Sequence, residues 1–454
     1  MKIHTSYSCR ITQYRNIFKE TVQIYRNAVD FFINVCLQEW SLFSNLQYQN
    51  ESTTVMENLT ITTARRSIVP YDFAKADQHF YKMPCYLRRA AIAEAYGKVC
   101  SYQSNLANWE AGDISIRCKR PSIPKAGYIF PALYKGNVYR NTSDPYTLEI
   151  KVYIRNTWDW LKINIRKSDI DYINCHCSSR KPMSPTLQKR GKVWSLDFAF
   201  EEKVELSDVP INEQIILAVD LGIKNACTCS AMSSDGTILG RRFLKLPREY
   251  DFLWHVVGKI KKAQRLGARN PKNLWARAKG LNDRISVLTA QFIVDTAVLY
   301  NADIIVMEHL DLQRKKRGSK KQRLALWRAK YVQSMVADKA HRLHMHISRI
   351  NAYNTSRLAF DGSGKVLRGK ESERTDGNYS LCEFQNGKLY NCDLNATYNI
   401  GARYFIRELL KPLPVTSRLA LEAKVPQIAK RSTCTLSTLI SLHAAFLELA
   451  PKNC

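Results

Sequence analysis

The sequence predicts an α/β protein whose two parts differ in character. Residues 214–412 favour an α/β domain, because short continuous apolar runs, typical of buried strands, alternate with long helical segments. Residues 1–213 combine amphipathic helical patterns with strands of alternating polarity, which favours a small barrel or sandwich beside a helical lobe. A chain of 454 residues with 45% hydrophobic content is long enough to bury a core in more than one domain.

Two amphipathic helices are predicted in the N-terminal part. Residues 17–40 place Val22, Tyr25 and Val29 on one face, and residues 86–109 repeat this spacing. Apolar stripes of this width indicate helices that pack against a core.

Three strands follow, over residues 148–154, 161–166 and 194–200, each alternating apolar with polar or small side chains. Their exposed faces carry Tyr, Lys and Arg, which suit phosphate contact and base stacking. Ordinary solvated strand faces explain the same pattern.

The second part begins with three predicted strands. Residues 215–219 form a continuous apolar run that ends at Asp220, which indicates a buried strand. Residues 226–232 and 237–244 predict two more, joined by a Ser-Asp-Gly turn at 234–236.

Helices and further strands complete this part. Residues 251–300 are predicted to be helical, with a break at 267–271, and residues 302–310 form a buried strand that contains Glu308. Another strand is predicted over residues 344–352.

A hairpin precedes the last helix of this part. Asn386-Gly387 is a strong hairpin turn signal, and a helix is predicted from Asp393 to about Leu410. A tail, residues 413–454, follows with an apolar helical patch near its end.

The charge balance points to a polyanionic partner. The chain has 69 Lys and Arg against 40 Asp and Glu, a net charge of +29. Nucleic acid is the natural partner for such an excess, because each neutralised phosphate releases counterions. No apolar run is long enough to span a membrane, so we expect no membrane partner. The N-terminus lacks a signal-peptide pattern and the 13 cysteines are odd in number and scattered, so a reducing, cytoplasmic location is expected.

Basic residues gather in two stretches. Residues 241–284 hold 13 Lys and Arg with 3 acids, and residues 313–328 hold 8 with none. Ten of these residues are predicted to bind nucleic acid: Lys261, Lys262, Arg265, Arg269, Lys272, Arg277, Arg314, Lys315, Lys316 and Arg317.

Three acids stand out by their position. Asp220 and Glu308 lie at the ends of buried strands, and Asp393 lies where a hairpin gives way to a helix. A charged carboxylate at such a buried position costs free energy unless a cation compensates its charge. Hard oxygen ligands of this kind select Mg²⁺ or Mn²⁺. Two such ions roughly 3.5–4 Å apart would support phosphodiester hydrolysis. A single strand-end Asp is more often a turn former or a helix cap, so the prediction depends on all three.

The order of elements favours an RNase H-like fold. Three strands joined by turns follow the first acid, then a helix, a strand with the Glu, and a final Asp on a helix. The neighbouring Lys224 and Asn225 could steady such a site or a phosphate, or could merely start a loop.

Three motifs resemble the RuvC nuclease of TnpB proteins and of the compact type V CRISPR effectors. LAVDLGIKNA, IIVMEHLDL and NCDLNATYNIGARYF contain the three acids, and Asn-Thr-Ser at 354–356 resembles the start of the family's target-binding insertion. The resemblance extends to specific motifs over about residues 214–408. Over residues 1–213 it concerns only the expected architecture.

The resemblance implies a RuvC-like nuclease domain, with a β-barrel wedge and a helical recognition lobe before it. It implies RNA-guided cleavage of DNA in a bacterial or archaeal cell, with guide RNA and target DNA as partners and one or two protein copies per guide. The predicted divisions are 1–213 for wedge and recognition region, 214–353 for nuclease core, 354–392 for the insertion, 393–412 for the last nuclease helix and 413–454 for the tail.

The insertion departs from the family pattern. The family usually carries two CxxC pairs that bind zinc here, whereas only Cys382 and Cys392 are present. Two thiolates cannot complete a tetrahedral site, so no zinc is predicted. The CxC pairs 175–177 and 227–229 are interpreted as packed thiols on strands.

Two alternatives to a guided endonuclease remain. One is a non-cleaving, RNA-guided DNA-binding repressor, which the missing CxxC pairs leave open although all three acids are present. The other is a transposase-like protein that joins DNA ends at the same kind of site.

Overall fold

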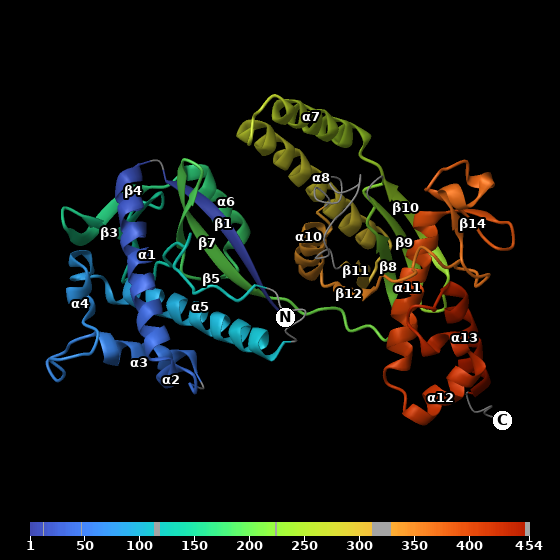
Figure 1. Cartoon of the computed structure of the whole chain (residues 1–454), viewed down its shortest axis with the longest axis horizontal. Coiled ribbons are helices and arrows are strands. Elements are labelled where there is room, and N and C mark those ends of the chain that lie inside the picture. The colour runs from blue at the N-terminus through green and yellow to red at the C-terminus, as the bar shows by residue number, and fades with distance from the viewer. Residues whose placement is uncertain (12, 47, 113–118, 223–224, 311–327, 450–454) are drawn as a thin grey trace. The chain divides into compact units, whose positions relative to one another are not determined.

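The computed structural model consists of two compact units, Lys2–Glu202 and Met1 with Lys203–Cys454 (Figure 1). It describes residues 1–11, 13–46, 48–112, 119–222, 225–310 and 328–449.

Helices and two small sheets build the first unit. Its helices are α1 (Arg15–Gln38), α2 (Trp40–Phe43), α3 (Gln49–Thr60), α4 (Phe73–Ala76), η1 (Gln78–Phe80), α5 (Cys85–Ala111) and α6 (Lys167–Cys177). Its strands are β1 (Lys2–Ile11), β2 (Tyr139–Asn141), β3 (Thr147–Ile154), β4 (Thr157–Asn164), β5 (Lys181–Pro182), β6 (Thr186–Arg190) and β7 (Val193–Lys203).

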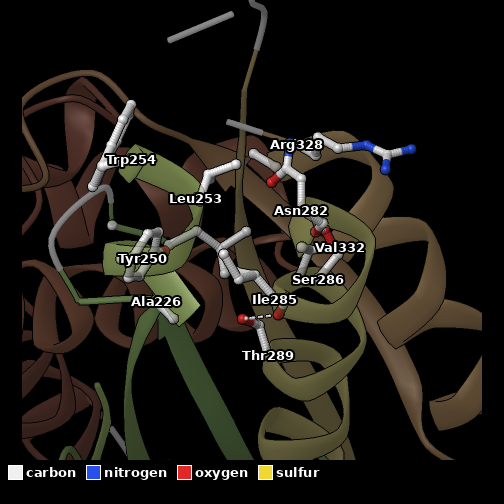
Figure 2. A pocket seen from close by; sticks show the side chains of 13 residues that line it. Ala226, Tyr250, Leu253, Trp254, Asn282, Ile285, Ser286, Thr289, Arg328 and Val332 are labelled. Atoms are coloured by element: carbon white, nitrogen blue, oxygen red, sulfur yellow. Dashed lines mark hydrogen bonds between the residues drawn. The ribbon is translucent and has the colours of Figure 1, made fainter. Parts of the chain in front are cut away.

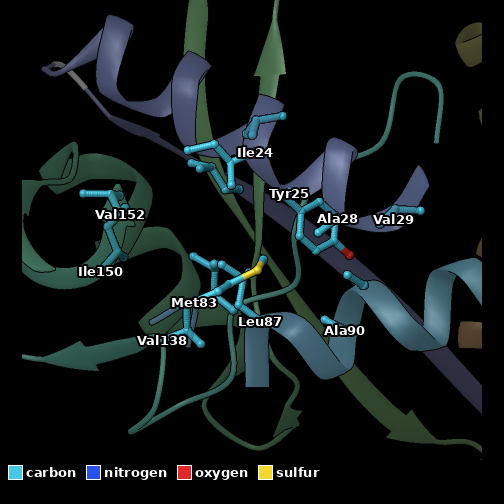
Figure 3. Close-up of a cluster of buried hydrophobic side chains, with 14 of the residues drawn as sticks. Ile24, Tyr25, Ala28, Val29, Met83, Leu87, Ala90, Val138, Ile150 and Val152 are labelled. Atoms are coloured by element: carbon cyan, nitrogen blue, oxygen red, sulfur yellow. The ribbon is translucent and has the colours of Figure 1, made fainter. Parts of the chain in front are cut away.

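The core of this unit lies between α1, α5 and the strands. Figure 3 shows Tyr25 and Ala28 of α1 beside Leu87 of α5, with Ile150 and Val152 of β3 in the same cluster. These side chains are buried because the apolar stripe of each helix faces the other elements.

The strands of the first unit form two sheets. β1, β7 and β5 are hydrogen-bonded in that order with β6 also on β7, and β2, β3 and β4 form a three-stranded antiparallel sheet. A single bridge pairs Ile11 with Ile165. Closure of this region into a barrel stays a prediction. One interpretation is wrong: Cys175 and Cys177 lie on helix α6, where only Cys177 is buried.

A five-stranded sheet organises the second unit. Its strands are β8 (Ile215–Asp220), β9 (Cys227–Ser233), β10 (Ile238–Leu244), β11 (Ile304–His309) and β12 (His346–Asn351), in the order β10-β9-β8-β11-β12. The first three strands pair antiparallel, whereas β11 and β12 run parallel to β8. These strands match the five predicted from apolar runs.

Helices cover both faces of this sheet (Figure 1). They are α7 (Pro247–Arg265), α8 (Lys272–Leu299), α10 (Ala329–Arg342), α11 (Cys392–Leu410), α12 (Val415–Lys424), η4 (Pro426–Ala429) and α13 (Leu436–Leu449). Alternate residues of β8 point to opposite faces, so Ala218 packs with α11 and α13 while Leu217 packs with α8 and α10. The sheet is therefore buried on both sides, as its continuous apolar strands require.

A small subdomain connects β12 to α11. It contains β13 (Leu367–Arg368), η2 (Gly369–Glu371), η3 (Glu373–Thr375), β14 (Leu381–Glu383) and β15 (Leu389–Asn391), and β14 lies between the other two strands. Gly387 has a φ of 80°, which the predicted hairpin turn requires. Its own core includes Ala359, Val366 and Phe384, together with Cys382 and Cys392, the two cysteines of the insertion.

Candidate active site

Two of the three predicted acids lie side by side at one edge of the five-stranded sheet. Asp220 is the last residue of β8, and Glu308 is the residue before the last of β11. Because the two strands are parallel and Met307 lies opposite Val219, both carboxylates emerge at the carboxyl ends of neighbouring strands. The third acid, Asp393, is in the first turn of α11, which packs on the same sheet.

The electrostatic surroundings of Asp220 include both of the other acids. Burial raises the pKa of Asp220 well above its ordinary value, and the negative charges of Glu308 and Asp393 raise it further, while Arg368 opposes the shift. With no cation nearby, this carboxyl group retains its proton at pH values where an ordinary Asp is ionised. A divalent cation would remove the repulsion and release the proton.

Glu308 is held by two polar neighbours. The hydroxyl of Thr355 donates to Oε1 of Glu308 at 2.5 Å, and Nε2 of Gln333 donates to its backbone carbonyl at 2.8 Å. Burial raises the pKa of Glu308, and the Thr355 hydrogen bond and the charge of Arg403 only partly counter that rise. Thr355 belongs to the Asn-Thr-Ser motif, and nothing in the sequence assigned it this role.

Asp393 is positioned by its helix and by one amide. The side chain of Asn391 caps α11 by accepting from the backbone N–H groups of Asp393 and Leu394, both at 3.0 Å. Nδ2 of Asn225 donates to Oδ2 of Asp393 at 2.7 Å, so the loop after β8 reaches the helix start. Lys224, its neighbour, lies outside the described residues.

The chemistry of this donor set fits hard divalent cations. Three carboxylates and no thiol or imidazole lie in these positions, which suits Mg²⁺ or Mn²⁺. Across the described residues, however, no three acidic, thiol or imidazole groups stand close enough together to hold a single ion. Side-chain movement on cation binding is therefore needed to complete a site.

A stripe of buried polar residues runs along α11 behind the acids. Asn395, Asn399 and Arg403 lie four residues apart, with 0, 0 and 5% of their surface exposed. Asn399 donates to the carbonyls of Thr355 and Leu358, both at 2.9 Å. The loop that holds Glu308 is thus fixed to the helix that carries Asp393.

Arg403 extends this brace to the C-terminal segment. Its guanidinium donates to the carbonyls of Asn351 and Tyr353 on one side, and to those of Ser432 and Cys434 on the other, at 2.7–3.1 Å. Sequence reasoning placed Asn395 in the third motif but missed Asn399 and Arg403, although a polar side chain at every fourth position of an apolar helix is a visible signal.

The predicted nucleic-acid contacts are described in part. α7 and α8 form an antiparallel pair with its own small core (Figure 1). Six of the predicted residues are exposed on these helices and their connection: Lys261, Lys262, Arg265, Arg269, Lys272 and Arg277. Arg314, Lys315, Lys316 and Arg317 lie outside the described residues.

A small cavity lies beside the loop after β8. Figure 2 shows Tyr250 and Leu253 of α7 and Ile285 of α8 around it, and Leu221 and Gly222 complete its wall. Its volume of about 40 Å³ has room for water but not for a nucleotide.

The close packing at Gly222 gives a first testable prediction. A Cβ at this position would lie 2.5 Å from the carbonyl oxygen of Asn225. The Gly222→Ala substitution is expected to displace the loop that carries Asn225, and with it Asp393, and to lower the cleavage rate proposed below by about 10²-fold. Gly280→Ala is the matched control, since a Cβ there meets no atom within 4 Å. Equal cleavage rates for the two variants would contradict the role of this loop.

Comparisons with known proteins give limited matches. Residues 3–154 match the model of the Aq_aa04 family. The matched residues are less than half of the chain. No curated protein matches the sequence. The described part of the chain contains no helix with the length and apolar character needed to cross a membrane.

Several solved structures of CRISPR effectors are similar at low scores. A Cas12f1–sgRNA–target DNA complex has 15% identity and a TM-score of 0.33, covering 88% of this chain and 98% of that chain. C2c1 of Alicyclobacillus acidoterrestris with single-guide RNA has 11% identity and a TM-score of 0.41, covering 86 and 68%. A Cas12i–crRNA–dsDNA complex has 11% identity and a TM-score of 0.38, covering 97 and 68%. TM-scores this low carry no argument about the activity of this chain.

Proposed function

We propose that this chain is an RNA-guided DNA endonuclease with a RuvC-like, RNase H-like site that hydrolyses phosphodiester bonds with two Mg²⁺ or Mn²⁺ ions. The observation that carries the proposal is that Asp220 and Glu308 lie at the carboxyl ends of neighbouring parallel strands and that Asp393 begins the helix packed on the same sheet. Bringing carboxylates together at such a position costs free energy, and proteins commonly arrange carboxylates in this way to hold cations.

The sheet topology supports the RNase H-like assignment. Three antiparallel strands, β8 to β10, are followed by β11 and β12, which add to the other side of β8 and run parallel to it. The acids occupy the carboxyl ends of the two central parallel strands and the start of the helix packed on them.

In this mechanism each acid has a distinct position. Asp220, at the end of β8, Glu308, near the end of β11, and Asp393, in the first turn of α11, would together hold the ions. When bound, two ions would activate water and stabilise the leaving oxygen. Thr355 and Asn225 keep the carboxylates of Glu308 and Asp393 oriented, which limits the reorganisation needed.

RNA guidance is proposed from the motif resemblance and the charge. The net charge of +29 and the exposed cations of α7 and α8 suit the backbones of a guide RNA and its DNA target. Base pairing would supply the sequence recognition, so the protein needs charge and shape more than base-edge contacts.

The test is to purify the chain with its RNA, sequence that RNA, and add DNA that matches it. Cleavage of the matching DNA with Mg²⁺, but not with a chelator, supports the proposal. Binding without cleavage in every metal tested would indicate the repressor alternative. Joined DNA ends and no associated small RNA would indicate a transposase-like protein.

A further inference from the structure

A second basic surface lies beside the second half of α11. It is a groove of about 710 Å³ between the end of β12, the second half of α11 and the α12–η4 segment. Six cationic and two acidic side chains line it: Arg349, Arg403, Arg407, Lys411, Arg418, Arg431, Glu408 and Glu422. An excess of four cations in a concave site attracts anionic ligands.

The groove extends along α11 away from Asp393. α11 begins beside Asp393, and the groove is lined by Arg403 to Lys411 of the same helix. At a rise of 1.5 Å per residue, these residues lie roughly 15–27 Å along the helix from Asp393. The opposite wall lies nearer to Glu308, because Ile350 of the groove is paired with Glu308 in the sheet.

Some of these cations already have partners. Arg403 donates to four carbonyls, and Arg407 pairs with Glu408 and donates to Ser348. Nη2 of Arg418 donates to the carbonyl of Lys411 at 2.7 Å. These bonds fix the walls of the groove.

Two other arginines are available to a ligand. The side chains of Arg349 and Arg431 are exposed, and neither guanidinium has a hydrogen-bond or ion-pair partner among the described residues. They come from β12 and from the segment after η4, so they lie on different elements around one groove. Arginine is suited to phosphate, because its planar fork of donors matches two phosphate oxygens.

One acidic side chain in the groove favours RNA over DNA as its ligand. Glu422 of α12 is half-buried in the groove wall, and its carboxylate has no partner in the described part of the chain. A carboxylate repels phosphate but accepts a hydrogen bond from a hydroxyl. The ribose 2′-OH is such a donor, and DNA lacks it.

We propose that this groove binds the backbone of an RNA strand, with phosphates on Arg349 and Arg431 and a ribose 2′-OH on Glu422. The inference rests on the proposed function only in taking the guide RNA as the natural ligand. It gives the C-terminal segment a role in holding that RNA.

The experiment measures binding of a short single-stranded RNA, and of DNA of the same sequence, to the full chain across a salt series in a chelator. Arg349→Gln/Arg431→Gln is expected to weaken RNA binding about 10-fold and to reduce the slope of log affinity against log salt by about 1.4, the value for two lost contacts to a single strand. The matched control, Arg342→Gln/Lys365→Gln, replaces two exposed cations elsewhere in the unit and should leave affinity and slope nearly unchanged.

Glu422→Ala separates RNA from DNA. It should weaken RNA binding several-fold and leave DNA binding equal or stronger, because a negative charge is removed. If the double arginine variant behaves like its control, or if Glu422→Ala affects RNA and DNA equally, the proposal is wrong. Since no cleavage is measured and metal is absent, these results are independent of whether the chain is a nuclease.

Discussion

Asp220→Ala is expected to abolish Mg²⁺-dependent DNA cleavage while leaving nucleic-acid binding nearly intact. Asp220 is one of the three carboxylates that would hold the cations, so its loss removes a ligand. Charge stabilisation by bound cations contributes several kcal/mol, so the rate should fall by at least about 10³-fold. The measurement is the single-turnover rate on matched DNA, with binding measured separately.

The same variant distinguishes chemistry from folding. Removing a half-buried carboxyl group should maintain or increase the melting temperature in a chelator, because the desolvation cost of that polar group disappears. Asp338→Ala, which removes an exposed acid on α10, is the control and should cleave at the normal rate. Cleavage by Asp220→Ala at the control rate would exclude the proposed mechanism.

Arg403→Met is expected to lower the free energy of unfolding of the second unit substantially. The variant keeps the volume of the stem but leaves four carbonyl groups without their charged donor. Because buried unsatisfied polar groups cost about 1–3 kcal/mol each and are not additive, a loss of the order of 3 kcal/mol or more is expected. Urea denaturation and hydrogen exchange of α11 and residues 351–358 measure it.

Arg342→Met is the matched control, since Arg342 is exposed at the end of α10. It should change stability by about 0.5 kcal/mol or less, as ordinary surface substitutions do. An equally small effect of Arg403→Met, with unchanged exchange in the loop, would show that the brace is not required.

The sequence predicted the strands of the nuclease-like sheet well, for a physical reason. A strand buried on both faces must be apolar throughout, so 215–219 and 302–310 were visible without any partner. An acid at the end of such a strand is equally visible, because it violates the pattern. The positions of Asp220 and Glu308 at strand ends therefore followed from local sequence.

The supporting contacts could not be predicted in the same way. Thr355 and Asn225 are ordinary loop residues, and their bonds to Glu308 and Asp393 depend on how distant segments fold together. The Cys175–Cys177 error has a similar cause, because a short segment with mixed polarity fits a strand or a helix. The packing of α6 on β1 selected the helix.

The brace at Arg403 limits how far this protein can be shortened. Truncations that shorten a protein usually begin at its ends. Here Ser432 and Cys434 accept half of the Arg403 hydrogen bonds, and Leu436 donates to Asn399. Deleting that segment would release the helix and the loop that orient two of the three acids, so miniaturisation has to stop beyond Leu436.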